Sequence, residues 1–172
     1  TVTDYTKIAS TDTAWGTAGK ETWYVADGIV NIITTTYDYD NNKNVYNPVE
    51  IKGNVNVILK NGAVVSVVNG IAGTDATITF YSESENASGV IGFIGATGDD
   101  GGWGTTNSGS DEANGKNGED GKDAVNVSSF TVAGGTVTVI GGDGGKGGGA
   151  GYGTNYDTIT ALAATAVTAV RL

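Results

Sequence analysis

Short runs of β-branched and other apolar residues, separated by turn residues, recur along the chain from Ile29 to Ile140. Apolar and polar side chains alternate within them, as in Asn54–Leu59 and Thr77–Phe80, which predicts strands with one buried face and one wet face. No segment before residue 154 combines helix caps with a 3.6-residue periodicity, so the pattern predicts an all-β protein. The expected strands span 29–36, 49–51, 55–59, 64–68, 76–81, 90–94, 124–132 and 136–140.

The expected strands follow one another at intervals of about ten residues, a spacing that fits both stacked coils and a sandwich. Asn61-Gly62 and Asn69-Gly70 lie where strands must turn, and Asn-Gly pairs serve hairpins and coil corners alike. The residue pattern therefore leaves two architectures open, a β-solenoid and a β-sandwich or jelly roll. The C-terminal segment 154–172 permits helix or strand, and its threonines favour a strand.

Glycine content divides the chain by composition, although its length suits one all-β domain over residues 1–172. Most of the 29 glycines lie between Gly89 and Gly153. The polar segment 99–123 is predicted to be an acidic, glycine-rich loop that leaves the core. The tract after Ile140 is too rich in glycine for a helix and predicts either a packed array of extended polyglycine strands or a mobile surface loop.

The composition excludes most catalytic and metal-binding chemistries. The chain has no Cys, His or Met, which removes thiol nucleophiles, His-based triads and the usual zinc and copper ligands. Acid pairs such as Glu83 and Glu85 share one face of a strand, and nothing in the sequence places them in a cleft. We therefore expect no enzymatic activity.

The charge balance restricts the partners that the chain can bind. A net charge of −10 and a pI near 4.1 repel nucleic acid and anionic membranes and favour cations and neutral polymers. No stretch approaches the roughly 20 apolar residues that cross a bilayer, so we expect no membrane insertion. The chain begins at Thr1 without a Met, which predicts signal-peptide cleavage and an extracellular or cell-surface location.

Two groups of oxygen-bearing side chains are candidate calcium sites. In the first group the oxygen-bearing residues occupy alternate positions of the sequence DYDNNKN, where an irregular loop can turn several oxygens toward one calcium ion. The alternative is that this segment is a plain polar hairpin tip without a metal. The second lies in the acidic segment 99–123, where calcium binding competes with a simple solvated loop. The candidate ligands are Asp38, Asp40, Asn42 and Asn44 in the first group and Asp99, Asp100, Asp120 and Asp123 in the second.

Exposed aromatic rings offer a flat apolar face with a polar edge, on which sugar rings can stack. Trp103 is the best candidate, because it lies among glycines in a polar segment where a core role is hardest to supply. Tyr152 and Tyr156 complete the predicted carbohydrate-binding set. Trp15 and Trp23 are further aromatic residues of this kind.

Three segments occur in an order that carries a resemblance to a known family. They are the strand Glu21–Val25, the line GNVNVILKNGAVVSVVNGI from Gly53 to Ile71 with the strand Thr77–Ser82 after it, and the unit Gly134–Gly149. In the sequence and order of these segments, the chain resembles secreted bacterial cell-surface β-helix proteins with glycine-rich repeats, of carbohydrate-binding or cell-wall-associated type. The resemblance implies a right-handed parallel β-helix whose coils stack on one another.

These observations favour a non-enzymatic extracellular structural protein, a self-assembling subunit of a surface fibre or layer. A coil stack without caps exposes unpaired strand edges, and the termini 1–8 and 158–170 carry strand-forming residues. Assembly would proceed by terminal-strand exchange or by end-to-end stacking, with a second copy of the chain as the partner. The alternative is a carbohydrate-binding adhesin module of a bacterial surface protein, with glycans as partners.

Overall fold

The protein is all-β in a computed structural model that describes residues 2–41, 43–85, 88–104 and 114–150. None of these residues is helical, which confirms the all-β prediction. Accordingly, the described part of the chain holds no apolar helix of bilayer-spanning length. The chain divides into two compact units, and residues 96–104, 114–122 and 141–150 belong to the second.

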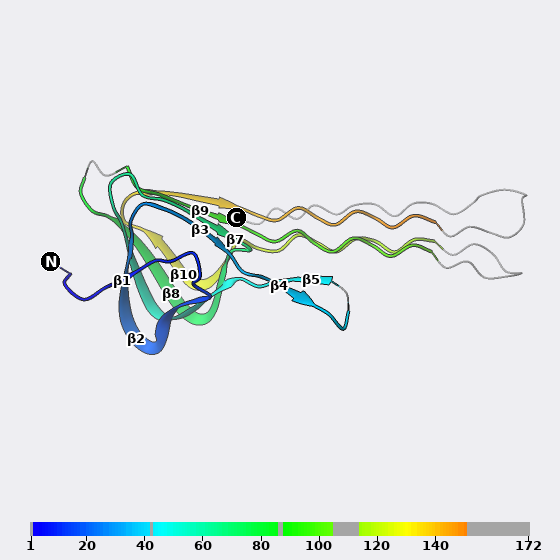
Figure 1. Ribbon diagram of the computed structural model, residues 1–172, viewed down its shortest axis with the longest axis horizontal. Coiled ribbons are helices and arrows are strands. Elements are labelled where there is room, and N and C mark those ends of the chain that lie inside the picture. Colours follow the sequence, from blue (N-terminus) through cyan, green and yellow to red (C-terminus); the bar gives the residue numbers. More distant parts are fainter. Residues whose placement is uncertain (1, 42, 86–87, 105–113, 151–172) are drawn as a thin grey trace, which may run out of the picture. The chain divides into compact units, whose positions relative to one another are not determined.

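The first unit is built from two sheets of parallel strands and one hairpin (Figure 1). Sheet A has the order β1-β2-β6-β8-β10, and sheet B has the order β11-β9-β7-β3. The strands of sheet A are β1 (Thr6–Lys7), β2 (Ala14–Ala26), β6 (Val49–Leu59), β8 (Ile71–Ser82) and β10 (Val125–Val132). Those of sheet B are β3 (Ile29–Ile33), β7 (Val64–Val68), β9 (Val90–Ile94) and β11 (Thr136–Ile140).

Each passage of the chain contributes one strand to sheet A and the next strand to sheet B, in the pairs β2–β3, β6–β7, β8–β9 and β10–β11. Successive passages stay in register, so that Ile29, Val64, Val90 and Thr136 form one row across sheet B. Parallel strands cannot be joined by a tight hairpin. Here each return path runs through the opposite sheet, so no helix is needed.

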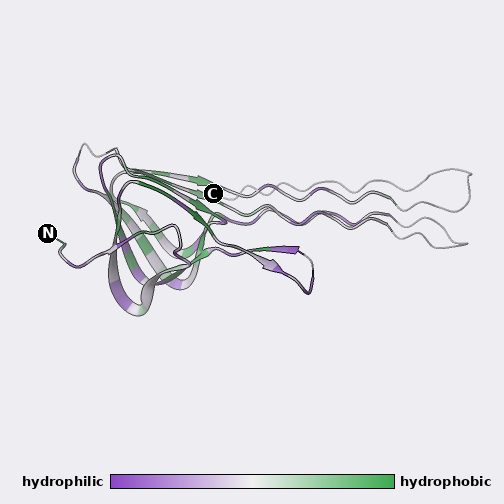
Figure 2. Cartoon of the chain, viewed as in Figure 1, coloured by the Kyte–Doolittle hydropathy of each residue, from purple (hydrophilic) through white to green (hydrophobic). Residues whose placement is uncertain are grey.

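The core lies between the inner faces of the two sheets. Val55, Val57 and Leu59 of β6 are buried, as the alternation in the sequence predicts, and hydrophobic and hydrophilic residues alternate along the strands (Figure 2). Phe80 of β8 and Phe93 of β9 are fully buried and meet across the core with ring centroids 5.7 Å apart. Burial of apolar surface is the dominant favourable term in folding, and large aromatic rings contribute much of it.

The long strands of sheet A bend where their register shifts. The shifts fall between Gly16 and Glu21 in β2 and between Glu50 and Asn54 in β6. Gly53 has a positive φ of 67°, and a Cβ on it would come within 2.4 Å of the carbonyl oxygen of Thr17. Glycine is required here because the backbones of two neighbouring strands touch at the bend.

The second unit consists of three extended segments, 96–104, 114–122 and 141–150, which run side by side in green, yellow-green and orange (Figure 1). Their backbone hydrogen bonds recur every third residue, as in Gly98 to Asp143 at 2.8 Å and Gly101 to Lys146 at 2.7 Å. A repeat of three matches the polyproline II helix, which has three residues per turn and no internal hydrogen bonds. The segments therefore satisfy each other's backbone groups.

The hydrogen bonds of the second unit form a closed cycle. The first segment donates to the third, the third donates to the second, and the second donates back to the first. Glycine occupies the crowded positions: a Cβ on Gly101 would lie 1.9 Å from the carbonyl oxygen of Lys116, and one on Gly121 would lie 1.9 Å from that of Gly142. Of the two predictions for the glycine tract, the packed array of extended strands is confirmed over 141–150.

Candidate functional site

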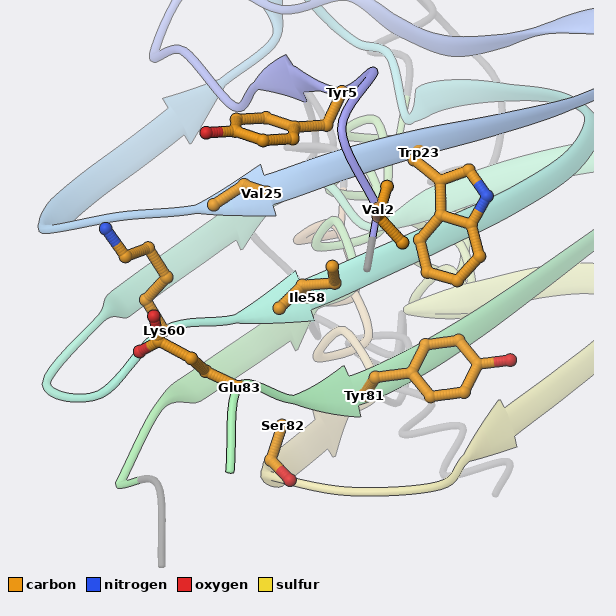
Figure 3. A pocket seen from close by; sticks show the side chains of 9 residues that line it. All are labelled: Val2, Tyr5, Trp23, Val25, Ile58, Lys60, Tyr81, Ser82 and Glu83. Atoms are coloured by element: carbon orange, nitrogen blue, oxygen red, sulfur yellow. The ribbon is translucent and has the colours of Figure 1, made fainter. Parts of the chain in front are cut away.

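An open groove of about 500 Å³ lies on the outer face of sheet A (Figure 3). Its walls combine three aromatic rings with aliphatic side chains and a polar end. Figure 3 shows the aromatic rings on the N-terminal segment, on β2 and on β8, with β6 between the last two. The lining residues are Val2, Tyr5, Trp23, Val25, Ile58, Lys60, Tyr81, Ser82 and Glu83.

The strand pleat places these side chains on the outer face, because successive residues point to opposite sides of a sheet. Tyr24, next to Trp23, packs against the core and accepts a hydrogen bond from the N–H of Gly16 at 2.9 Å. Phe80, next to Tyr81, is buried in the core. Trp23 and Tyr81 therefore point outward, because the residue next to each in the strand points inward. Both are half-buried.

Trp23 and Tyr81 stack on one another across β6. Their ring centroids are 5.5 Å apart and their planes are inclined by 29°. Asn56 of β6 pairs in register with Trp23 on β2, and although it carries a polar amide it is only 8% exposed. Its Nδ2 donates to Oε1 of Glu21 at 2.9 Å. The buried amide beside the aromatic pair therefore has a hydrogen-bond partner within the protein.

The charged groups at the polar end of the groove are compensated by neighbours within the protein. Asp27 lies between two lysines, with Lys7 Nζ at 3.3 Å and Lys60 Nζ at 3.5 Å from its Oδ2. The hydrogen bond from Lys7, together with the positive charge of Lys60, lowers the pKa of Asp27 below its ordinary value of 3.8. Glu83 Oε2 accepts the backbone N–H of Asn61 at 3.1 Å. The groove therefore requires no charged ligand.

The polar tips of the three aromatic residues are available to a ligand. Tyr5 is 54% exposed, and Trp23 and Tyr81 are partly exposed. Within the described residues, neither the two phenolic hydroxyls nor the indole N–H makes a hydrogen bond. The groove thus offers ring faces for apolar contact and three unsatisfied polar groups at its rim.

The first predicted calcium group lies on the hairpin of β4 (Thr35–Asp38) and β5 (Lys43–Tyr46). Asp38 does not turn toward a shared centre; its Oδ1 accepts the N–H of Asp40 at 3.0 Å, and its Oδ2 accepts Nδ2 of Asn41 at 2.8 Å. These hydrogen bonds lower the pKa of Asp38, the side chain of Asn41 contributing most. Asn44 pairs with Tyr37 in the ladder, and Asn42 lies outside the described residues.

The second predicted calcium group is spread over both units. Asp100 Oδ1 accepts the backbone N–H of Lys146 at 2.8 Å, and the carbonyl oxygen of Asp99 accepts the N–H of Glu119. Asp120 is exposed in the second unit, and Asp123 is exposed in the first. Over the described ranges, no three acidic side chains come close enough together to hold a metal ion. Calcium binding stays a prediction that this geometry does not support.

Trp103, the predicted carbohydrate-binding residue that the structure describes, is not among the residues that line the groove. Trp103 belongs to the second unit, is 69% exposed and rests against Gly149, where a Cβ would lie 2.5 Å from its ring. Tyr152 and Tyr156 lie outside the described residues. The sequence singled out Trp23 only as a further aromatic residue and missed Tyr5 and Tyr81. For Tyr81, its position directly after the alternating Thr77–Phe80 was the signal that would have placed it on the outer face.

Comparison with known proteins finds no matching family model, no matching curated protein and no matching solved structure. The resemblance to secreted bacterial surface proteins therefore stays a prediction from the sequence.

Proposed function

We propose that this chain is a non-enzymatic extracellular module that binds a neutral polysaccharide in the groove of Tyr5, Trp23 and Tyr81. The observation that carries the proposal is the stacked Trp23–Tyr81 pair on an open sheet face, with Tyr5 lining the same groove. Sugar rings present C–H faces that pack against aromatic rings and hydroxyls that hydrogen-bond to their edges. An open groove of this kind admits a chain of sugars as well as a single ring.

A neutral ligand is favoured by the charges around the groove. Lys60 already pairs with Asp27, and Glu83 already accepts a backbone N–H. The net charge of −10 repels acidic polysaccharides at long range. Unpaired hydroxyl and indole groups are suited to sugar hydroxyls, which both donate and accept hydrogen bonds. Neutral polysaccharides of this type occur at cell surfaces, which agrees with the expected extracellular location.

The absence of catalysis is proposed from the residues that line the groove. Glycoside hydrolysis requires two carboxyl groups flanking the scissile bond. Glu83 is the one carboxylate among the nine lining residues, and its Oε2 is occupied by Asn61. The groove is therefore built to hold a ligand rather than to transform it.

The scaffold is proposed to be a short right-handed parallel β-solenoid. Support comes from the in-register rows across both sheets and from the alternation of sheet A and sheet B along the chain. In such a scaffold Trp23 stands on the first coil and Tyr81 on the third, with β6 of the second coil between them. Side chains on paired strands keep their spacing better than side chains on loops, which suits recognition of a repeating polymer.

A polysaccharide panel tests the proposal. The protein is incubated with insoluble neutral glucans, mannans and xylans and with one acidic polysaccharide, and the bound fraction is measured beside Trp23→Ala and Trp103→Ala. We expect at least one neutral polymer to be retained, with Trp23→Ala losing at least tenfold in affinity, which is about 1.4 kcal/mol, while Trp103→Ala binds like the unaltered chain. Binding that survives Trp23→Ala, or binding confined to the acidic polymer, overturns the proposal.

A further inference from the structure

The two ends of the strand stack in the first unit differ. At the β1 end, Ile8 and Trp15 are buried, and the indole N–H of Trp15 donates to Asp12 at 2.9 Å. The strand β1 pairs with Tyr24 and Val25 and covers that part of the edge of sheet A. This end of the core is therefore closed by the protein's own N-terminal residues.

At the other end, β10 and β11 are the last strands of their sheets in the described chain. The inward-facing Phe130, Val137 and Val139 pack on the core but remain only partly buried. Val132, which pairs in register with the buried Phe80, is 48% exposed. Apolar side chains that point into the core and still meet solvent indicate a surface that another element covers.

Neither edge strand carries a charge, although the chain as a whole carries −10. Soluble proteins commonly protect a free strand edge with lysine, proline or an inward charge, because an unprotected edge pairs with another strand. The sequences of β10 and β11, VNVSSFTV and TVTVI, contain none of these devices. Two such edges can approach each other without like-charge repulsion.

The hydrogen-bonding direction of β11 can be read from its ladder. Thr136 donates its N–H to Gly89, and Ile140 accepts from Gly95, so Thr136, Thr138 and Ile140 turn their backbone groups toward β9. Backbone groups alternate in direction along a strand. Those of Val137 and Val139 therefore point to the free edge, where no described strand pairs with them.

We infer that two copies of this chain pair through the free edges of β11, antiparallel and around a two-fold axis at Thr138. In this register Val137 exchanges both backbone hydrogen bonds with Val139 of the partner subunit. Thr138 then faces Thr138 of the partner subunit as a non-hydrogen-bonded pair, and the inward valines of both copies cover each other. The contact is isologous and closes as a dimer.

A second copy in this arrangement fits better than a fibre, because only one end of the core is exposed. Ile32 on β3, the other edge strand of sheet B, is fully buried, whereas Val137 and Val139 on β11 are only partly buried. Head-to-tail growth would bring the exposed end of one core onto an end that is already covered, because Thr6–Lys7 pair with part of β2 and Ile8 is buried there. The residues beyond 150 are the other segment that could lie on β11. The experiment separates these three occupants.

Cysteine crosslinking tests the register directly, because the chain contains no native cysteine. A non-hydrogen-bonded antiparallel pair has Cα atoms about 4.5 Å apart, within the range of about 4.4–6.8 Å that a disulfide spans. We expect full-length Thr138→Cys to form a covalent dimer under mild oxidation. Ser66→Cys, on the inner strand β7 of the same sheet, serves as the collision control and should stay monomeric.

Solution mass provides the second readout. The unaltered chain should sediment at twice 17.3 kDa. Val139→Pro removes an N–H that no described strand uses, so the fold is retained while the dimer dissociates to monomer. A monomer at all concentrations with no Thr138→Cys crosslink overturns the dimer and leaves the edge to the chain's own C-terminal residues. A crosslink that appears only when Thr138→Cys is mixed with Asn31→Cys overturns it in favour of head-to-tail stacking.

Discussion

Gly118 and Gly145 approach so closely in the second unit that a Cβ on Gly118 would lie 2.2 Å from the carbonyl oxygen of Gly145. The same spacing recurs at each third residue of the three extended segments, where the neighbouring backbone fills the space that a side chain would need. The glycine content of this region therefore has a steric cause. It permits hydrogen bonding between backbones that no larger residue would allow.

Gly118→Ala is expected to disrupt the second unit, because the added methyl group cannot be placed without separating two segments. Overpacking of this kind costs about 1–3 kcal/mol. Amide hydrogen exchange is the measurement: Glu119, Gly145 and Gly148, which donate across the segments, should lose protection. Gly102→Ala is the matched control, since its nearest neighbour is the flexible Lys116 side chain at 3.9 Å. Equal protection in both variants would contradict the steric argument.

Tyr81→Ala is expected to weaken polysaccharide binding, since it removes one face of the aromatic pair and leaves Trp23 free to rotate. Tyr81→Phe keeps the ring and loses only the hydroxyl, so it should retain most of the binding. Aromatic pairs contribute about 0.5–1.5 kcal/mol beyond the area that they bury. Affinity electrophoresis through the retained polymer measures the difference. If both variants bind equally well, the ring of Tyr81 has no part in recognition.

The carboxylate of Asp27 predicts a pH dependence of stability at the acidic end. Its pKa in the folded chain lies below the ordinary value of 3.8, because the Lys7 hydrogen bond and the Lys60 charge favour the ionised form. The stabilisation is therefore complete above pH 3.8 and is lost as the pH falls through the folded pKa. Urea midpoints of the unaltered chain and Asp27→Asn should differ slightly at pH 6 and converge below that pKa. If the urea midpoints of the two proteins still differ at the lowest pH, the stability difference does not come from ionisation of Asp27.

Phe80→Ala is expected to be the most damaging single truncation in the first unit. Phe80 is fully buried and contacts both Phe93 and Phe130, with ring centroids 5.7 Å and 5.4 Å away. Replacing a buried Phe by Ala costs about 3–5 kcal/mol through lost transfer energy and the cavity left behind. Chemical denaturation measures the free energy of unfolding. Thr79→Ala, the outward neighbour, should change it by about 0.5 kcal/mol or less.

Much of the first unit was predictable from alternation alone. The pattern of Asn54–Leu59 indicated which residues of β6 enter the core, and the burial of Val55, Val57 and Leu59 confirms it. The extents of the strands were less accessible. The sequence predicted a strand over 76–81, whereas β8 begins at Ile71, because pairing with β6 and β10 holds the Gly73 region extended despite its low strand propensity.

The candidate site was the least predictable part. Trp103 was favoured because it stands alone among polar residues, and it is indeed exposed, but no other aromatic ring lies beside it in the described chain. Trp23 and Tyr81 are distant in the sequence and meet because β2 and β8 flank β6 in sheet A. Tyr5 joins them because β1, which follows it, pairs with β2. Periodicity assigns a side chain to a face and carries no information on strand order.

The sequence by itself determined the all-β class and the faces of the strands, because these depend on local periodicity. Only the tertiary structure decided that the strands pair in parallel, that the glycine tract packs with segments 96–104 and 114–122, and that three aromatic rings share one groove. These features depend on register and strand order. Both are set by the cooperative burial of the whole core between the two sheets.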